Sequence, residues 1–374
     1  MPNRYENEVK KEWEKFQREN KLLPNIMLLG ATGCGKSSFI NRVFCKKLAP
    51  VNDVSRGTDG FQTYLGREHG MGVNLIDSRG YEMEDGSGES FTAYRDSIKQ
   101  KMAESRDGKP LEKIHIIWYC ISVAAERIQD YDIKIIKLLR SDSDLRRRVA
   151  IVFTKCDEDD ECGSTAQQFR HIITSEVGAN IPMFEVSTDD ELELEIEELI
   201  SWSAEQLDDA DIKEAFISSQ VVNLNAKHDA ANTRIAIYAA SAAGIAAAPI
   251  PISDALLLTP LQISMSAHII HIYGMDNYVS ISSALIGNVV ISNLGKAFAG
   301  GLLKLIPGIG SLVGGLINAG VASLITSALG FAISEICYDS CKKIAKGEFV
   351  DFSTMFALET IQTYIQEYKK SKKH

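Results

Sequence analysis

The sequence has few prolines, few cysteines and no excess of positive charge. Nine prolines and 27 glycines among 374 residues exclude a collagen-like or low-complexity chain. A formal net charge of −10 argues against nucleic acid as a partner, because a nucleic-acid-binding chain is usually basic. The length exceeds what one ordinary hydrophobic core needs and predicts two domains.

The seven cysteines are odd in number and do not follow the spacing of a metal site. Cys337 and Cys341 are four residues apart and would share one helix face, but no second pair completes a ligand set. Residues 1–6 are charged where a secretory signal would be apolar. We therefore expect reduced thiols and a cytoplasmic protein, with membrane association as the alternative that the second half of the chain raises.

A glycine-rich segment follows the apolar run Ile26–Leu29 and precedes a stretch with helical spacing, Phe39–Phe44. It satisfies G-x-x-x-x-G-K-[ST], and strand, glycine loop and helix in this order predict a phosphate-binding loop. Lys36 would reach the β- and γ-phosphates as a catalytic charge, and Ser37 would ligate Mg²⁺. The expected nucleotide contacts of this loop are Gly30, Ala31, Thr32, Gly33, Cys34, Gly35, Lys36, Ser37 and Ser38.

A second motif, Asp77-Ser78-Arg79-Gly80, ends an apolar run about forty residues after this loop. An acidic residue at the end of a strand is where a phosphate-loop enzyme holds Mg²⁺, so Asp77 is an expected metal ligand. Gly80 could offer its backbone N–H to the γ-phosphate. Thr58 lies in a polar segment and would sense both Mg²⁺ and the γ-phosphate, as a metal ligand and a catalytic residue.

A third motif, Thr154-Lys155-Cys156-Asp157, follows another apolar run and fits [NT]-K-x-D. The Asp157 carboxylate can accept from both N1–H and the exocyclic amine of guanine, whereas adenine offers no such pair of donors. The Lys155 stem would lie along the base, and Ser187 occupies the place of a loop that touches guanine O6. These residues predict GTP and GDP as ligands, with Mg²⁺ as the metal.

Apolar strands alternate with helical segments over residues 25–205, which predicts an α/β domain with a mainly parallel sheet and its ligand at the strand C-termini. The expected divisions are an N-terminal amphipathic helix (1–24), a nucleotide-binding domain (25–205) and an α-helical hydrophobic domain with a basic tail (206–374). Within the second division we expect strands over 61–67, 72–76, 114–121, 150–153 and 183–186, and helices over 130–139 and 189–198.

The three motifs together resemble the Era-like and septin-like P-loop GTPases of the translation-factor class, and the first loop is also similar to that of immunity-related and immune-associated GTPases. The resemblance implies a GTPase switch. Two departures qualify it: Tyr81 stands where Ras-like proteins often have glutamine, and Gly33 stands where potassium-activated relatives have asparagine. We therefore expect slow hydrolysis that is raised by a partner or by homodimerisation through the GTPase domain. A GTP-binding interaction module without hydrolysis is the alternative.

The second half contains long charge-free stretches, of which 305–334 is the longest. Such stretches qualify by length as membrane spans, so one hypothesis is a membrane-associated GTPase that contacts lipid through residues 235–334 and inserts or assembles there, as dynamin-like or tethering GTPases do. Scattered Ser, Asn and His residues favour a soluble helical bundle instead. The segments 248–254, 259–262 and 272–274 resemble a helical domain of unknown function that follows the GTPase domain in Era-like proteins.

Overall fold

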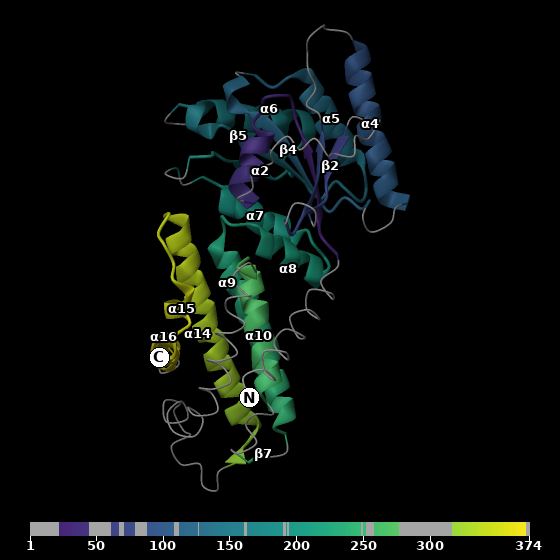
Figure 1. Cartoon of the computed structure of the whole chain (residues 1–374). Helices are drawn as coiled ribbons and strands as arrows, with labels where there is room; N and C mark the ends of the chain where they lie inside the picture. The colour runs from purple at the N-terminus through teal and green to yellow at the C-terminus, as the bar shows by residue number, and fades with distance from the viewer. Residues whose placement is uncertain are drawn as a thin grey trace. The chain divides into compact units, whose positions relative to one another are not determined.

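The computed structural model separates the chain into two compact units, Leu22–Asn223 and a helical unit that begins at Leu224 (Figure 1). It describes residues 22–44, 61–66, 71–78, 88–107, 112–125, 127–160, 163–189, 192, 194–247, 250–251, 258–276 and 316–371. The expected N-terminal helix, Thr58, Gly80 and Tyr81 lie outside these residues.

The first unit is built on a six-stranded sheet in the order β2-β3-β1-β4-β5-β6. All neighbouring strands are parallel except β2, which pairs antiparallel with β3. This confirms the mainly parallel α/β fold expected from the sequence. The strands are β1 (Asn25–Leu29), β2 (Phe61–Tyr64), β3 (Asn74–Ser78), β4 (Ile116–Ser122), β5 (Val149–Thr154) and β6 (Met183–Glu185).

The helices of this unit cover both faces of the sheet because the central strands are buried on both sides. They are α2 (Lys36–Phe44), α4 (Gly88–Asp107), α5 (Asp130–Ser141), α6 (Ser164–Val177), α7 (Ile196–Glu205) and α8 (Ala210–Ser219), with short 3-10 turns η1 (Val123–Ala125) and η2 (Cys156–Glu158). On β4, Ile117 and Tyr119 join one core with residues of α4, α5 and α6. The intervening Trp118 faces Phe39 of α2 and Phe216 of α8.

The first unit extends further along the chain than expected, to Asn223 instead of residue 205. The cause is packing: the Trp118 ring contacts Phe216, and Val221 donates its backbone N–H to Val43 O at 2.9 Å. Asn223 also binds Ser201 Oγ through its side chain at 3.0 Å. Helices α7 and α8 therefore belong to the sheet unit.

The helix expected over 189–198 begins later, at Ile196. Glu195 holds the preceding segment at the sheet, because its carboxylate accepts from Glu185 N at 2.8 Å and from Arg170 Nη2 at 2.5 Å. The chain can turn into a helix only after this anchor. The sequence did not predict helix α4, because its apolar residues are sparse and many of its residues are charged.

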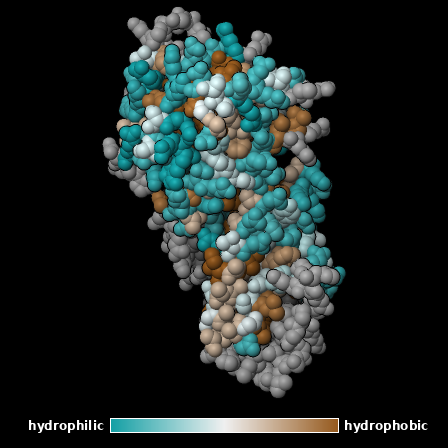
Figure 2. Space-filling view, turned by 180° about the vertical axis from the view of Figure 1, so that it is seen from behind, coloured by the Kyte–Doolittle hydropathy of each residue, from teal (hydrophilic) through white to brown (hydrophobic). Residues whose placement is uncertain are grey.

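The helical unit has its own core, formed by α9 (Leu224–Ile245), α10 (Thr259–Ile272), α14 (Ala319–Ala345) and α16 (Leu358–Ser371). Helix α14 packs against the other three, and a Cβ added at Gly330 would lie 2.7 Å from Ile235 of α9 and 3.0 Å from Met265 of α10. Two short pieces, β7 (Ile250–Pro251) and β8 (Leu316–Ile317), pair antiparallel, and α15 (Phe352–Met355) precedes α16. On the face shown in Figure 2, apolar residues are more frequent over this unit than over the sheet unit.

Candidate functional site

The loop between β1 and α2 has the backbone that close approach to phosphate requires. Gly30, Gly33 and Gly35 have φ angles of 136°, 77° and 89°, which residues with a side chain rarely adopt. A Cβ at Gly30 would lie 2.3 Å from the carbonyl oxygen of Cys120, so only glycine fits there. Around the Gly33 position, by contrast, no described atom lies within 4 Å of an added Cβ. The loop is therefore fixed at its base and open at its tip.

Lys36 starts α2 and folds back over this loop. Its ammonium donates to the carbonyl oxygens of Gly30 at 3.0 Å and Ala31 at 2.9 Å, and the side chain is 8% exposed. The next residues, Ser37 and Ser38, are exposed in the first turn of α2. A positive charge, a hydroxyl and a helix N-terminus therefore meet at the mouth of the loop, which suits a phosphate group.

Asp77 lies beside this loop because β3 pairs in parallel with β1, with Asp77 opposite Leu28. Burial raises the pKa of Asp77 to about 6, and the nearby Lys36 ammonium opposes this shift. Its buried Oδ1 atom has no hydrogen-bond partner among the residues that the structure describes. A buried carboxylate oxygen without a donor, near the Lys36 ammonium, fits Mg²⁺ or a water bound to it. The described residues contain no cluster of three or more His, Cys, Asp or Glu side chains that could hold another metal.

The end of β5 is tied to the phosphate loop by Thr154. Its buried hydroxyl donates to the carbonyl oxygen of Cys34 at 2.5 Å. A Cβ at Gly35 would contact the Thr154 side chain at 3.5 Å. Thr154, which we expected among the ligand contacts, therefore supports the loop from below. Its hydroxyl proton is already donated within the protein.

Lys155 and Asp157 follow Thr154 in a turn with unusual backbone. Lys155 has φ 57°, the one positive φ at a non-glycine residue in the described part of the chain. The Ser187 hydroxyl, which is buried, donates to Asp157 Oδ1 at 2.5 Å. Ser187 thus orients the carboxylate that would recognise guanine. The contact between the backbone of its loop and guanine O6 stays a prediction. The second carboxylate oxygen, Oδ2, has no hydrogen-bond partner among the residues that the structure describes and can accept from a base.

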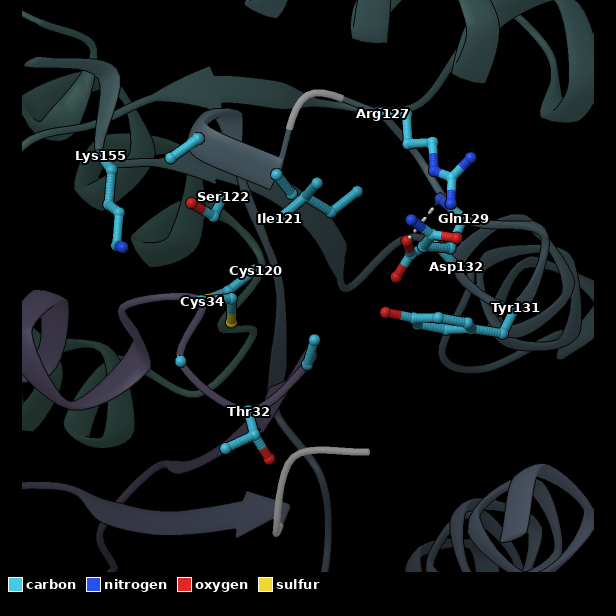
Figure 3. A pocket seen from close by; sticks show the side chains of 14 residues that line it. Thr32, Cys34, Cys120, Ile121, Ser122, Arg127, Gln129, Tyr131, Asp132 and Lys155 are labelled. Atoms are coloured by element: carbon cyan, nitrogen blue, oxygen red, sulfur yellow. Dashed lines mark hydrogen bonds between the residues drawn. The ribbon is translucent and has the colours of Figure 1, made fainter. Parts of the chain in front are cut away.

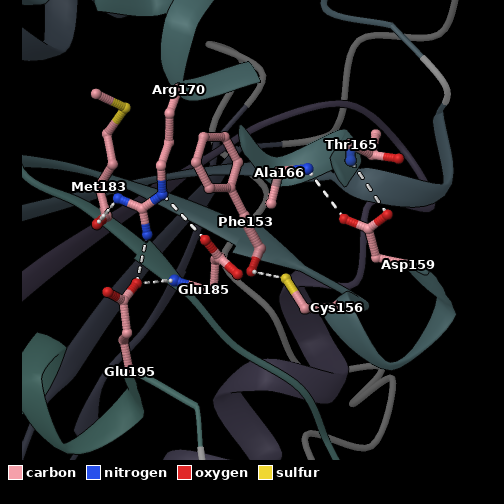
Figure 4. A network of polar contacts seen from close by, with 9 residues as sticks. All are labelled: Phe153, Cys156, Asp159, Thr165, Ala166, Arg170, Met183, Glu185 and Glu195. Carbon is pink, nitrogen blue, oxygen red and sulfur yellow. Dashed lines mark hydrogen bonds and ion pairs between the residues drawn. The ribbon is translucent and has the colours of Figure 1, made fainter. Parts of the chain in front are cut away.

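A polar network fixes the elements around this turn (Figure 4). Arg170 on α6 donates to Glu185 Oε1 at 3.0 Å, to Met183 O at 2.8 Å and to Glu195. Asp159 caps the start of α6 by accepting from the backbone N–H of Ala166 at 2.9 Å. These contacts join α6, β6 and the segment before α7. They fix the elements that surround the Lys155–Asp157 turn.

A pocket of about 250 Å³ opens beside the phosphate loop (Figure 3). Its walls come from the loop tip, the end of β4 with η1, the start of α5, and Lys155. The lining polar side chains include Arg127, Gln129, Tyr131 and Asp132, none of which we selected from the sequence as a site residue. The isolated sequence carried no motif that would have identified them, because their proximity to residues 31–34 depends on the parallel pairing of β1 and β4.

The structure therefore gathers most of the expected residues at the C-terminal edge of one sheet. Residues 30–38 and Asp77 lie together, Lys155 lines the same pocket as residues 31–34, and Asp157 and Ser187 are joined by a hydrogen bond. Thr58 and Gly80 lie outside the described residues, so their assignments stay predictions.

Comparison with known proteins agrees with this geometry. Residues 25–155, roughly a third of the chain, match the family of 50S ribosome-binding GTPases. No curated protein matches the chain significantly.

Three solved structures similar to this chain are GTP-binding proteins. Toc33 from Arabidopsis thaliana, in complex with Mg²⁺ and GMPPNP, is 12% identical with a TM-score of 0.32, covering 52% of this chain and 82% of that one. A probable GTP-binding protein EngB is 15% identical with a TM-score of 0.35, covering 49% and 97%. Era, in complex with MgGDPNP and 16S ribosomal RNA nucleotides, is 15% identical with a TM-score of 0.31, covering 48% and 55%. The first unit of the chain is a mainly parallel α/β domain that is similar over residues 25–155 to the 50S ribosome-binding GTPases.

Proposed function

We propose that the chain binds GTP together with Mg²⁺, hydrolyses it slowly to GDP and phosphate, and acts as a nucleotide-dependent switch coupled to its helical unit. The observation that carries this proposal is the Asp157 carboxylate, held by Ser187 at 2.5 Å and placed at the end of the strand that supports the phosphate loop. With Oδ2 free and a second lone pair left on Oδ1, this fixed carboxylate can accept from two adjacent N–H donors, which favours guanine.

The chemistry of each side chain in the site determines its proposed role. Lys36 would neutralise the β- and γ-phosphates, and the N–H groups at the start of α2 would bind the same oxygens. Asp77 and Ser37 would hold Mg²⁺, which supplies positive charge to the phosphates when bound. The Lys155 stem would lie against the base, and Asp157 would read its edge.

Slow turnover is expected because Tyr81 cannot orient a water molecule as a glutamine amide does. Help from a second copy of the GTPase domain or from another protein would raise the rate. The five described cysteines are free thiols, which supports a reducing, cytoplasmic compartment.

The test is titration calorimetry of the full chain with GTP, ATP and XTP, combined with a phosphate-release assay. We expect GTP to bind at least tenfold tighter than ATP, and Asp157→Asn to shift the preference toward XTP. Glu176→Gln, which alters an exposed carboxylate on α6, is the matched control and should leave the preference unchanged. Equal affinity for GTP and ATP would refute the guanine assignment. Tight GTP binding without phosphate release would instead support the non-hydrolysing module.

A membrane-associated GTPase is the second candidate, and one observation favours it. Of the described helices, α14 is long and apolar enough to cross a membrane by length and composition. Its most apolar 18-residue segment has a mean hydropathy of 1.6, although 67% of this segment is buried inside the protein. Flotation of the full chain with anionic liposomes, with GTP analogue and with GDP, tests this candidate. Recovery of the chain in the dense fractions under both conditions would count against it.

A further inference from the structure

The proposed hydrolysis needs more positive charge at the phosphates than Lys36 alone supplies. Charge develops on the transferring phosphoryl group, and enzymes of this kind stabilise it with fixed cations. Two cationic side chains line the pocket beside the phosphate loop, Lys155 and Arg127. Lys155 lies 3.8 Å from Glu158 and belongs to the base-recognition turn. Arg127 is the cation with no role assigned.

Arg127 is exposed, and its guanidinium forms no ion pair or hydrogen bond with any residue in the described part of the chain. Two other arginines of this unit are engaged: Arg170 binds Glu185 and Glu195, and Arg147 binds Asp208 at 2.7 Å. An unpaired arginine keeps its full charge at any physiological pH and presents five donors to an anion.

The carboxylate that lines the pocket together with Arg127, that of Asp132, already accepts hydrogen bonds within the protein. Asp132 accepts from the hydroxyl of Tyr119 at 2.7 Å and from the backbone N–H of Gln129 at 3.0 Å. Burial raises the pKa of Asp132, which further weakens it as a counter-ion. The pocket therefore contains a free cation and a carboxylate that is satisfied by other donors.

The backbone that carries Arg127 is anchored to the sheet. Arg127 N–H donates to Ala125 O at 2.7 Å, and α5 begins three residues later with reciprocal capping between Gln129 and Asp132. Through Asp132 this turn is bonded to the buried Tyr119 of β4, the strand that pairs with β1 ahead of the phosphate loop. Figure 3 shows the Arg127 side chain extending from this turn beside Gln129 and Asp132. The base of the side chain is fixed while its end is free to reach a ligand.

We propose that Arg127 is a catalytic residue that donates to the transferring phosphoryl group of GTP and stabilises its transition-state charge. This inference rests on the proposed GTPase function. The guanidinium acts either on the phosphate bound by its own chain or on the phosphate of a second copy facing the pocket. The arms of the experiment distinguish these two sources.

The first arm compares GTP turnover and GTP affinity of the wild type, Arg127→Ala and Arg127→Lys. We expect kcat of Arg127→Ala to fall by about 100-fold or more, with the Kd for GTP changed less than threefold. Lysine should restore little of the rate, because it lacks the planar pair of donors. Arg140→Ala, an exposed arginine at the other end of α5, is the control and should turn over at the wild-type rate.

A second readout separates a catalytic role from a structural one. GDP with aluminium fluoride mimics the transferring phosphate, so Arg127→Ala should lose binding of this complex while its GDP affinity and thermal midpoint stay within error. Mixing Arg127→Ala with Lys36→Ala then locates the donor: recovered turnover shows that the arginine acts on the other copy, and no recovery shows that it acts within its own chain.

The two hypotheses fail differently. A wild-type chain that releases no phosphate refutes the proposed hydrolysis. A wild-type chain that hydrolyses GTP, together with Arg127→Ala at the same kcat and the same affinity for GDP–aluminium fluoride, refutes the role of Arg127 and leaves the GTPase assignment intact.

Discussion

Replacing Asp77 with asparagine should stabilise the protein in the absence of Mg²⁺ and nucleotide. Burial raises the pKa of Asp77 from 3.8 to about 6, so its ionised form is disfavoured in the folded state. A difference of about 2 pKa units corresponds to roughly 3 kcal/mol, and partial exposure of this carboxylate reduces the penalty to about 2 kcal/mol. Asparagine has a similar shape and carries no charge, so it avoids this penalty.

The sign of the pH dependence follows from the raised pKa. The penalty is complete above pH 6, where the carboxylate is ionised in both states, and it disappears as the pH falls from about 6 to about 4. The free energy of unfolding of Asp77→Asn should therefore be about 2 kcal/mol higher than that of the wild type at pH 7.5. This difference should vanish near pH 4. Urea unfolding in EDTA at both pH values measures it.

Bound nucleotide and Mg²⁺ should reverse the order of stability of the wild type and Asp77→Asn. If Asp77 holds Mg²⁺, then Mg²⁺ and a GTP analogue should stabilise the wild type more than Asp77→Asn, so that the variant loses a function while gaining intrinsic stability. Asp96→Asn, in an exposed ion pair on α4, is the control and should change stability by less than about 1 kcal/mol. An Asp77→Asn variant that is less stable than the wild type in EDTA at pH 7.5 would refute the reasoning.

Three further predictions concern the phosphate loop, the base-recognition turn and His115, which directly precedes β4. Gly30→Ala should destabilise the fold by more than about 3 kcal/mol in urea unfolding, whereas Gly33→Ala, which meets no described atom, should cost only about 1 kcal/mol for its positive φ. Ser187→Ala should weaken GTP binding about tenfold in calorimetry, with ATP binding unchanged, because it removes the donor to Asp157. Burial lowers the pKa of His115 to about 4, and its Nδ1 accepts from Asn25 N. The wild type should therefore lose up to about 3 kcal/mol relative to His115→Asn as the pH falls from 6.5 to 4.

The sequence predicted the fold of the first unit well because local patterns specify it. Apolar runs bounded by glycine, aspartate or threonine predicted the strands, and parallel pairing then brings their C-terminal ends to one edge. Residues 30–38, Asp77 and Asp157 carry recognisable motifs at those ends, so their convergence followed from the topology. The continuous apolar run 114–121 correctly indicated a strand buried on both faces.

What the sequence could not predict depends on contacts between distant residues. The bond from Ser187 to Asp157 and that from Thr154 to Cys34 join segments 30 and 120 residues apart, and no local pattern records them. The boundary at Asn223 likewise depends on Phe216 packing against Trp118. Arg127 belongs to no motif, and its interest follows only from the pocket that it lines.

The apolar composition of α14 has an explanation within the protein itself. Its buried face meets α9, α10 and α16, and Gly330 lets Ile235 and Met265 approach closer than any side chain would allow. The same bundle buries Lys227, which donates to the carbonyl oxygen of Ile272 at 3.0 Å and thereby satisfies the C-terminal end of α10. Transfer of α14 alone into lipid would uncover this core and leave the charged Glu335 of α14 without its partner His228. Membrane association of the folded chain should therefore proceed without unpacking α14, through surfaces that remain exposed in the bundle.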